Sequence, residues 1–452
     1  MNHFVYVDRN TPMLLSPDLR DWVPDDDLVH FVIEVIETMH LSFHINRRGC
    51  GSRQYPPKMM LALLVYCYCN SIFSSRRIER STYRDVAVRY LTGDTHPDHD
   101  TICKFRRENF DAVNEAILQV LQLARQLGIL KVGTVSVDGT HLRANASKDR
   151  NVRYDRACEL EDQLREDVTA LMQQAEEADD HDDQDGQSLP AEISRRERLR
   201  ERMREAREQL ESEAKKRAHA ERLAQEKKRK EREKQPNRRK MRVLQEPDDT
   251  PRDRDQTNLT DADSRLMRKS RREGYTQSYN AQAVVDADGS MLIVGGYVTN
   301  QANDANELPR AIASVDESLG EVKRVLADTG YSKADVFDEL DSSGIDAFVA
   351  VSRNENHEQR RYDYRPERVR KKKGQVIKDS RLLAMREKLR TDAGREIYAK
   401  RKQTVEPVFG IIKQVMGFRQ FLLRGLDKVN GEWSLLRLAY NMKRMQKLIS
   451  AI

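Results

Sequence analysis

A charged block between about Asn151 and Asp255 constrains the fold of this chain more than any other feature. The block consists mostly of Glu, Arg, Lys, Asp, Gln and Ala, and apolar residues recur in it only as two narrow stripes at helical spacing. The stripes are Leu160, Leu164, Val168 and Leu171, and then Leu199, Met203, Ala206 and Leu210. They predict two long amphipathic helices that pack as an antiparallel hairpin or coiled coil.

The acidic run from Asp179 to Gly186 is expected to form the loop between the two helices. The mixed-charge run after Lys215 is interpreted either as a solvated helix or as disordered chain, until a series of prolines beginning at Pro236 ends the helical pattern. We interpret residues 151–260 as an insertion. The hairpin either supports dimer contacts or is a solvated spacer, and the sequence favours neither.

The stretch from Thr134 to Ala146 precedes this block and carries the first candidate site residue. A run rich in β-branched residues ends in Asp138, Gly139 is expected to make a turn, and a second strand-like run follows. A carboxylate at the end of a buried strand is poorly solvated, so it must be paired, hydrogen-bonded or bound to a metal. From this stretch alone, the commoner interpretation is an aspartate that caps a turn.

An α/β pattern resumes after the block. The elements are expected at Tyr279–Val285, Met291–Val298, Asp304–Leu319 (helix), Val325–Ala327, Lys333–Leu340 (helix) and Ala347–Val351. With the strand before the block, the order is β-β-β-α-β-α-β, which is the order of the ribonuclease H-like fold. The predicted fold class is therefore α/β, with a ribonuclease H-like catalytic core interrupted by the charged helical hairpin and preceded by an all-α N-terminal domain.

Residues 1–125 are predicted to form the helical N-terminal domain. Helix starts are indicated at Pro24–Asp27, Tyr55–Pro57 and Asp98–Thr101. The last of these helices is expected to expose a basic face made by Lys104, Arg106 and Arg107. Small basic helical domains are often DNA-binding, as in the helix-turn-helix, and a packing domain with an ordinary solvated basic face is an equal alternative.

The remaining parts are assigned as residues 126–150 and 261–352 for the sheet, 353–385 for a basic loop and 386–452 for C-terminal helices. In the basic loop, Arg370, Lys371 and Lys372 are candidate DNA phosphate contacts, and the alternative is a flexible charged loop. The C-terminal helices carry Glu406. Pro407 is expected to kink the helix or to start a new one at Glu406.

Composition indicates where the protein works. The net charge is only +6, but 80 basic and 74 acidic residues can segregate into patches that favour nucleic acid. Five cysteines without repeated spacing argue for a reducing compartment, and neither His96, His99 and Cys103 nor Cys67 and Cys69 fit a structural zinc pattern. With no signal peptide pattern and no apolar run near the ~20 residues of a membrane span, a soluble, cytoplasmic protein without membrane contact is expected.

Two aspartates, Asp138 and Asp328, each follow a strand of the predicted sheet. In the ribonuclease H-like order the first and fourth strands are adjacent, so their ends converge, and a helix carrying Glu406 can lie against the same end. Three carboxylates brought together would repel one another and need cations. Mg²⁺, with Mn²⁺ as a possible substitute, suits such oxygen ligands, and two ions ~3.5–4 Å apart would clamp a phosphodiester.

The segments around these residues resemble those of bacterial insertion-sequence transposases of the DDE class. The matching stretches are VSVDGTHLRANA around Asp138, LADTGY around Asp328 and VEPVFGIIK around Glu406. The helical N-terminal domain of the family is similarly matched by YPPKMML and DHDTICKFR. The resemblance covers most of the chain outside the charged block, and it implies that the three carboxylates form a metal-binding, catalytic triad.

Many members of the family carry a Tyr-Arg-Glu-Lys signature around the glutamate. Lys413 lies seven residues after Glu406, as that signature requires. The expected Arg position is Lys402 and the expected Tyr position is Ala399, so Tyr398 and Arg401 each lie one residue too early. A kink at Pro407 could absorb this shift. The resemblance implies that Tyr398, Arg401, Lys402 and Lys413 hold DNA phosphates, where a lysine lacks the bidentate fork of an arginine.

The resemblance implies a DNA transposase that binds insertion-sequence ends, cleaves phosphodiesters and performs strand transfer by two-metal-ion chemistry. Its partners would be double-stranded DNA, as terminal repeats and as target, and a second copy of the chain when the ends are synapsed. When bound to DNA it would associate with the nucleoid. Two alternatives remain: a non-catalytic DNA-binding protein derived from a transposase, and a ribonuclease H-like nuclease that hydrolyses without strand transfer.

Overall fold

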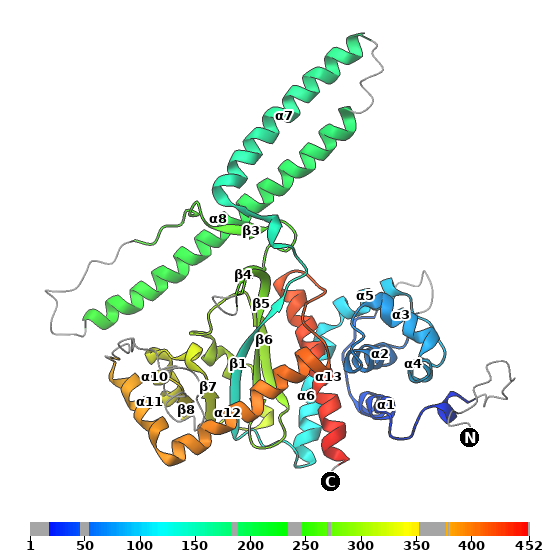
Figure 1. Ribbon diagram of the computed structural model, residues 1–452, viewed down its shortest axis with the longest axis vertical. Helices are drawn as coiled ribbons and strands as arrows, with labels where there is room; N and C mark the ends of the chain where they lie inside the picture. Colours follow the sequence, from blue (N-terminus) through cyan, green and yellow to red (C-terminus); the bar gives the residue numbers. More distant parts are fainter. Residues whose placement is uncertain are drawn as a thin grey trace, which may run out of the picture.

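The fold is seen in a computed structural model, which describes residues 18–45, 54–181, 189–233, 246–268, 273–351, 377 and 379–450. A mixed sheet lies at its centre, and a long helical hairpin projects away from one end of the sheet (Figure 1). The short N-terminal helices lie to one side, beyond the pair formed by α6 (Phe110–Gln126) and α13 (Leu426–Ile449) (Figure 1). The molecule is therefore mixed α/β with a helical N-terminal region.

The central sheet has the order β6-β5-β1-β7-β8, and the short strand β4 also pairs with β5. The strands are β1 (Thr134–Arg143), β4 (Arg265–Met267), β5 (Thr276–Asp286), β6 (Ile293–Thr299), β7 (Arg324–Ala327) and β8 (Asp346–Val349). β5 is antiparallel to β1 and β6, whereas β7 is parallel to β1 and β8. The predicted adjacency of the strands that carry Asp138 and precede Asp328 is confirmed, and β4 was not predicted.

Strand β1 differs from its prediction at Gly139. The predicted turn is wrong, because β1 pairs with β5 without interruption from Val135 to Arg143. A Cβ at position 139 would collide with Nε2 of Gln282 and lie 2.8 Å from Oδ1 of Asp304. The glycine is therefore required by close packing, and Asp138 lies inside a strand and not at its end.

Helices cover both faces of the sheet. On β7 and β8, Leu326 and Phe348 face a cluster with α11 (Ser380–Arg390) and α12 (Asp392–Gly410), while the alternate residues face the main core. On the other side, α9 (Glu307–Ala313) contacts β5 and β6, α10 (Ala334–Ser342) contacts β8, and α13 contacts β6. Helix α9 is shorter than predicted, with a separate 3₁₀ turn at Glu317–Leu319.

The C-terminal region corrects two expectations. Helix α12 contains Pro407 and runs unbroken to Gly410, where a short π-helical segment, Ile411–Val415, continues it. A fresh helix start at Glu406, one of the two expected outcomes at Pro407, is therefore wrong. Helix α11 begins at Ser380, inside the predicted basic loop, and Arg370, Lys371 and Lys372 lie outside the described residues.

The N-terminal helices share one hydrophobic cluster with the sheet. They are η1 (Leu19–Trp22), α1 (Leu28–Thr38), α2 (Pro57–Cys69), α3 (Ser75–Arg84), α4 (Val86–Leu91) and α5 (His99–Glu108). Helix α2 is buried along almost its whole length, and it packs on α13, which itself packs on α6 and β6. The helical region is therefore fixed to the sheet through α13.

The expected exposed basic face on α5 is wrong for Arg106. This residue is 5% exposed, and its Nη1 donates to Oη of Tyr68 at 3.0 Å and to the carbonyl of Phe73 at 3.1 Å. Because α5 turns this side toward α2, only Lys104 and Arg107 of the predicted face reach solvent. Arg106 is thus placed for packing and not for contact with DNA.

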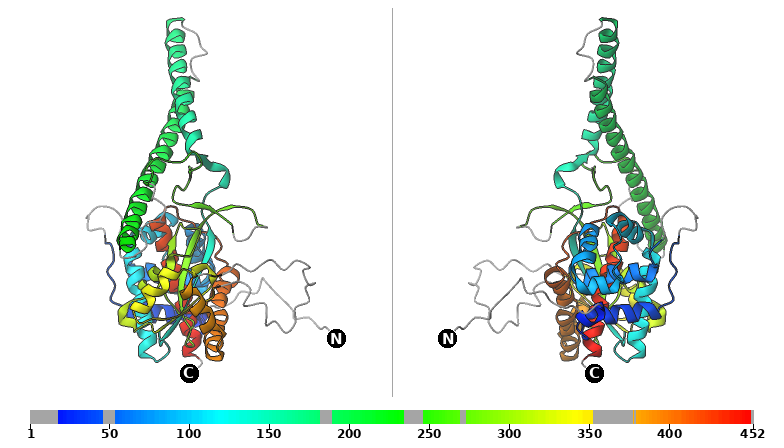
Figure 2. Two further views of the ribbon diagram at one scale, coloured as in Figure 1. Left: turned by 90° about the vertical axis from the view of Figure 1, so that its left-hand side faces the viewer. Right: turned by 90° about the vertical axis from the view of Figure 1, so that its right-hand side faces the viewer.

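The charged block forms the predicted antiparallel hairpin from α7 (Tyr154–His181) and α8 (Leu189–Glu233), which extends far from the sheet in both views of Figure 2. Its buried seam contains Leu164, Val168, Met203, Ala206 and Leu210. Part of the predicted loop is helical, since α7 continues to His181. Helix α8 extends through the mixed-charge run, so the solvated-helix interpretation of that run is correct.

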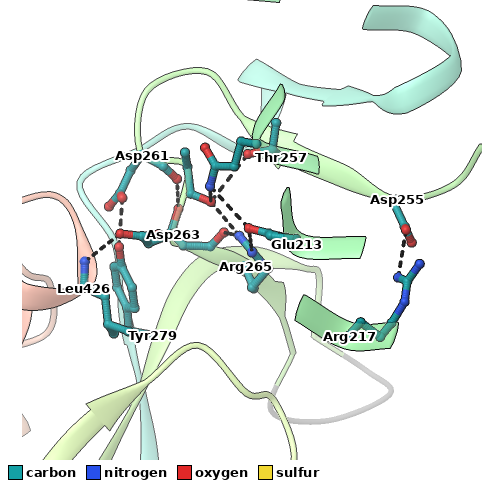
Figure 3. A network of polar contacts seen from close by, with 12 residues as sticks. Glu213, Arg217, Asp255, Thr257, Asp261, Asp263, Arg265, Tyr279 and Leu426 are labelled. Carbon is teal, nitrogen blue, oxygen red and sulfur yellow. Dashed lines mark hydrogen bonds and ion pairs between the residues drawn. The ribbon is translucent and has the colours of Figure 1, made fainter. Parts of the chain in front are cut away.

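Polar contacts fix the base of the hairpin to the sheet (Figure 3). The two ends of the block pair as β2 (Asn151–Arg153) and β3 (Gln256–Asn258). Arg265 of β4 donates to Glu213 of α8, and Oη of Tyr279 donates to Asp261 at 2.8 Å. No helix in the described part of the chain is long and apolar enough to cross a membrane.

Candidate active site

The three predicted carboxylates come from three different elements. Asp138 lies inside β1, Asp328 directly follows β7, and Glu406 lies in the last third of α12. β1 and β7 are neighbouring parallel strands, and α12 contacts both of them. The fold therefore brings the three side chains to one place, and Glu406 comes from a helix that is continuous across Pro407.

Arg401 connects all three carboxylates. Its Nη2 lies 3.3 Å from Oδ2 of Asp138 and 3.9 Å from Oδ2 of Asp328. Its Nη1 donates to Oε1 of Glu406 at 3.1 Å. Arg401 itself is on α12, five residues before Glu406. The structure thus gathers these four predicted residues around one guanidinium.

The site is graded from a buried floor to an exposed rim. The side chains of Arg401 and Asp138 are 9% and 19% exposed, whereas those of Asp328 and Glu406 are 39% and 50% exposed. A ligand that approaches from solvent would therefore meet Asp328 and Glu406 first. Asp138 would contact only what enters the site fully.

Burial raises the pKa of Asp138 to about 7, although Arg401 opposes this change and Asp328 adds to it. Burial alone would lower the pKa of Arg401, but the surrounding carboxylates, Asp138 above all, more than offset burial and raise it. The guanidinium therefore stays charged. The attraction of this guanidinium does not offset the burial of Asp138 and the repulsion from Asp328, so ionisation of Asp138 stays unfavourable.

Of the other residues considered for the Tyr-Arg-Glu-Lys signature, some lie at the site and one is exposed to solvent. Lys413 donates to Oγ1 of Thr140 and to the carbonyl of His141 at 3.2 Å, so its ammonium group is fixed on β1 close to Asp138. Tyr398 is half-buried, and burial raises the pKa of its hydroxyl to about 12. Lys402 is exposed on α12. Arg401, and not Lys402 at the expected position, therefore faces the carboxylates.

Asp304 is a fourth carboxylate at the site, and sequence reasoning missed it. Its Oδ1 accepts hydrogen bonds from Asn280 and Gln282 of β5, both at 2.7 Å. A Cβ at Gly330 would lie 2.9 Å from Oδ1 of Asp328 and 3.5 Å from Oδ2 of Asp304. Asp304 and Asp328 thus converge beside that glycine. Two amide side chains at alternate positions of β5, Asn280 and Gln282, were the signal that could have indicated a polar partner.

The donor set has the chemistry of a site for Mg²⁺ or Mn²⁺, because all of its ligands would be carboxylate oxygens. As the side chains stand, no three acidic, histidine or cysteine residues within the described ranges are close enough to hold a metal ion together. The guanidinium of Arg401 lies among the carboxylates instead. The residues fit divalent cations provided that Arg401 gives up these contacts.

Comparison with protein families supplies the decisive observation. A model described as the transposase DDE domain matches residues 253–442, and a model described as a transposase domain, DUF772, matches residues 17–108. The chain belongs to the DDE transposases of insertion sequences. No curated protein and no solved structure gives a significant match.

Of the two matches, the one to the DDE domain covers residues of the site. Asp304, Asp328 and Glu406 lie inside the matched DDE domain. Asp138 lies between the matches, in the segment that also holds the helical hairpin. The pairing of β1 between β5 and β7 joins this segment to the matched domain. The contribution of Asp138 to the site therefore rests on geometry.

Proposed function

We propose that this transposase binds the ends of its insertion sequence, cleaves phosphodiesters there and joins the ends to target DNA. Asp138, Asp328 and Glu406 would hold two divalent cations. The observation that carries the proposal is that these three carboxylates, from β1, the end of β7 and α12, converge on the single guanidinium of Arg401. The family match to a DDE domain supports it.

When bound, the cations would supply Lewis-acid activation of the phosphodiester and of the attacking hydroxyl, water in cleavage and a DNA 3′-hydroxyl in strand transfer. The chain provides the ligands and their placement. Asp138 is held by β1 and accepts a hydrogen bond from the amide of Gly139 at 2.9 Å. Asp328 accepts one from the amide of Gly330 at 2.7 Å. These backbone contacts orient the two carboxylates before any ligand arrives.

Two cationic residues would interact with the substrate phosphates. Arg401 would have to leave the carboxylates for divalent cations to bind there, and its guanidinium could then contact a phosphate in bidentate fashion. Lys413 is already positioned on β1 by Thr140 and by the carbonyl of His141. Charge on both sides of the carboxylates would hold the scissile phosphate in place.

The test uses labelled DNA from each side of the coding region, so that the terminal repeats are included. Wild-type protein with Mg²⁺ or Mn²⁺ should nick this DNA at defined positions and join the ends to a supercoiled plasmid. Asp138→Asn should abolish both products. Asp341→Asn, at an exposed carboxylate of α10, is the matched control and should leave both unchanged.

Each alternative function predicts a different outcome of this test. A non-catalytic protein derived from a transposase would bind the ends and never cleave them with any divalent metal. A ribonuclease H-like nuclease would hydrolyse DNA without joining it to the plasmid. Cleavage that survives in Asp138→Asn would show that Asp138 is not part of the catalytic site.

A further inference from the structure

An open groove of about 920 Å³ lies next to the carboxylates, and its lining includes His141 and Lys413 from the site described above. We call it the β1–β5 groove. It is lined by the end of β1 and the chain after it, by the start of β5 and by the turn after α12. Its polar and charged lining includes His141, Arg143, Lys148, Glu273, Lys413 and Arg419.

The charge of the groove fits a polyanion. Four of its lining side chains, Arg143, Lys148, Lys413 and Arg419, are basic, whereas Glu273 is its acidic member. Arg143 and Lys148 are exposed, and neither makes an ion pair with any residue that the structure describes. Uncompensated basic side chains in a concave surface attract phosphate groups and release counterions from DNA.

An exposed aromatic ring lies in the same groove. Tyr275 is 49% exposed although it is large and apolar, and the guanidinium carbon of Arg268 lies 4.9 Å from its ring centroid. Aromatic rings in basic grooves stack on nucleic-acid bases. The bases inside a duplex are already stacked on each other, so away from a duplex terminus such a ring stacks on a base that is unpaired or displaced.

The groove begins where the carboxylate site ends. Lys413 belongs to both, since it lines the groove and contacts Thr140, two residues after Asp138. Arg143 is five residues after Asp138 on the same strand, which is roughly 16 Å at the rise of a β-strand. Side chains alternate between the two faces of a strand, so Arg143 leaves β1 on the face opposite to Asp138, and Lys413 is the residue that joins the carboxylate site to the groove.

The floor of the groove is rigid before any ligand binds. Gln277 of β5 donates to Oγ of Ser264 at 2.8 Å, and the neighbouring Tyr279 donates to Asp261 (Figure 3). Across the groove, Arg419 donates to the carbonyl of Lys413 at 3.0 Å. Binding to such a preformed surface costs little ordering of the protein.

We propose that the β1–β5 groove binds an unpaired DNA strand next to the scissile phosphodiester. Arg143 and Lys148 contact the phosphates of this strand, and Tyr275 stacks on one of its bases. The proposal rests on the proposed function, because it takes the carboxylates as the place of cleavage. It adds that the DNA end is opened, and not fully paired, where it leaves the site.

The test measures DNA binding by the full chain carrying Asp138→Asn, in EDTA, so that no cleavage occurs. The probes are a short fluorescent duplex with blunt ends and the same duplex with a single-stranded 3′ overhang, each titrated at several salt concentrations. Arg143→Ala with Lys148→Ala should weaken binding to the overhang at least tenfold. It should also reduce the slope of log K against log salt by about 1.4, at ~0.7 per phosphate contact on single strands.

Matched variants separate groove binding from general effects of charge. Arg324→Ala removes an exposed arginine at the opposite end of the sheet, at the start of β7, and should change affinity less than threefold. Tyr275→Ala should weaken the overhang probe roughly tenfold and the blunt duplex hardly at all, whereas Tyr275→Phe should retain stacking. Thermal unfolding of each variant confirms that it is folded.

Two results would overturn the proposal. One is equal loss of affinity for both probes in Tyr275→Ala, or no loss for either. The other is an Arg143→Ala, Lys148→Ala variant that behaves like Arg324→Ala. Failure of the proposed function is recognised separately, because it appears as absent cleavage by the chain with Asp138 intact, whatever the groove variants do to binding.

Discussion

Two regions of the molecule place an arginine near carboxylates, and they differ in the ratio of negative to positive charges. Between the N-terminal helices and α13, Arg106 and Tyr68 face Glu432. At the edge of the sheet, Arg401 faces Asp138, Asp328 and Glu406. The first group has one carboxylate for one guanidinium, and the second has three carboxylates for one.

The first group is complete. Glu432 is fully buried and accepts hydrogen bonds from the amides of Leu422 and Leu423, at 2.9 and 3.0 Å, and from Oη of Tyr68 at 3.4 Å. Burial raises the pKa of Glu432, and Arg106 opposes that change. The formal charges of Arg106 and Glu432 sum to zero. Such a charge-balanced group stabilises the packing around α2, which contacts both α5 and α13.

The second group is incomplete. With all three carboxylates ionised, its formal charge is −2, that is three negative charges and one positive charge. Its rim is open to solvent at Asp328 and Glu406. The difference teaches that burial of an arginine beside a carboxylate does not identify a functional site. An excess of carboxylates over cations, at an open edge, is the feature that requires an added cation.

The largest predicted effect concerns the complete group. Arg106→Ala should lower the free energy of unfolding by about 3–5 kcal/mol, because it leaves Glu432 buried without its cation. Urea denaturation measures the change. Arg107→Ala, at the exposed neighbour, should lie within about 0.5 kcal/mol of wild type. A small effect of Arg106→Ala would mean that Glu432 is neutral in the folded protein.

The incomplete group predicts stabilisation by metal. Mg²⁺ or Mn²⁺ at a hundredfold excess over its Kd should raise the free energy of unfolding by about 2.7 kcal/mol, because the ion binds the folded chain and not the unfolded one. Asp328→Asn should lose most of this gain, while Asp341→Asn keeps it. The comparison would break if metal stabilised Asp328→Asn as much as wild type.

The raised pKa of Asp138 predicts a pH dependence of the metal-free protein. The pKa rises from 3.8 to about 7 on folding, so the unfolded chain binds fewer protons between these values and stability falls as pH rises through them. Above pH 7, Asp138→Asn should therefore be more stable than wild type by on the order of 2 kcal/mol. Below pH 4 the two should be equal. A constant difference across this range of pH would contradict the assignment.

The smallest predicted effect separates two adjacent cations of α12. Arg401→Ala should tighten Mn²⁺ binding roughly tenfold, about 1.4 kcal/mol, because the metal no longer competes with a guanidinium. Lys402→Ala removes the same charge from an exposed position, where solvent screens it, and should change the affinity less than threefold. Equal effects of the two variants, measured by titration calorimetry, would mean that Arg401 does not occupy the metal position.

Much of the candidate site could be predicted because the order of strands and helices along the chain indicates which strands are neighbours in the sheet. The β-β-β-α-β-α-β order places the first strand beside the fourth, and this is enough to bring Asp138 near Asp328. Local details were less predictable. A glycine after Asp138 indicated a turn, but tertiary packing against Gln282 and Asp304 keeps β1 straight through Gly139.

Errors on helices had the same origin. Pro407 predicted a break in α12, yet the helix continues through it, with Val405 and Val408 buried on either side. The residues around Arg106 in the sequence are typical of an exposed basic helix face. Its burial follows from the position of α2, whose Tyr68 it contacts. Asp304 is held at the site by hydrogen bonds from Asn280 and Gln282 of β5, and the residues next to Asp304 in the sequence do not indicate these contacts. Long-range contacts decide all three cases.

The central claim is that the carboxylates around Arg401 are a metal site. Anomalous diffraction from a crystal of the protein soaked in Mn²⁺ tests it most directly. The account predicts an anomalous peak ~2.1 Å from carboxylate oxygens of Asp138 and at least one of Asp328 and Glu406, with the guanidinium of Arg401 displaced from them. A structure without such a peak, in which Arg401 still bridges all three carboxylates at saturating Mn²⁺, would contradict it.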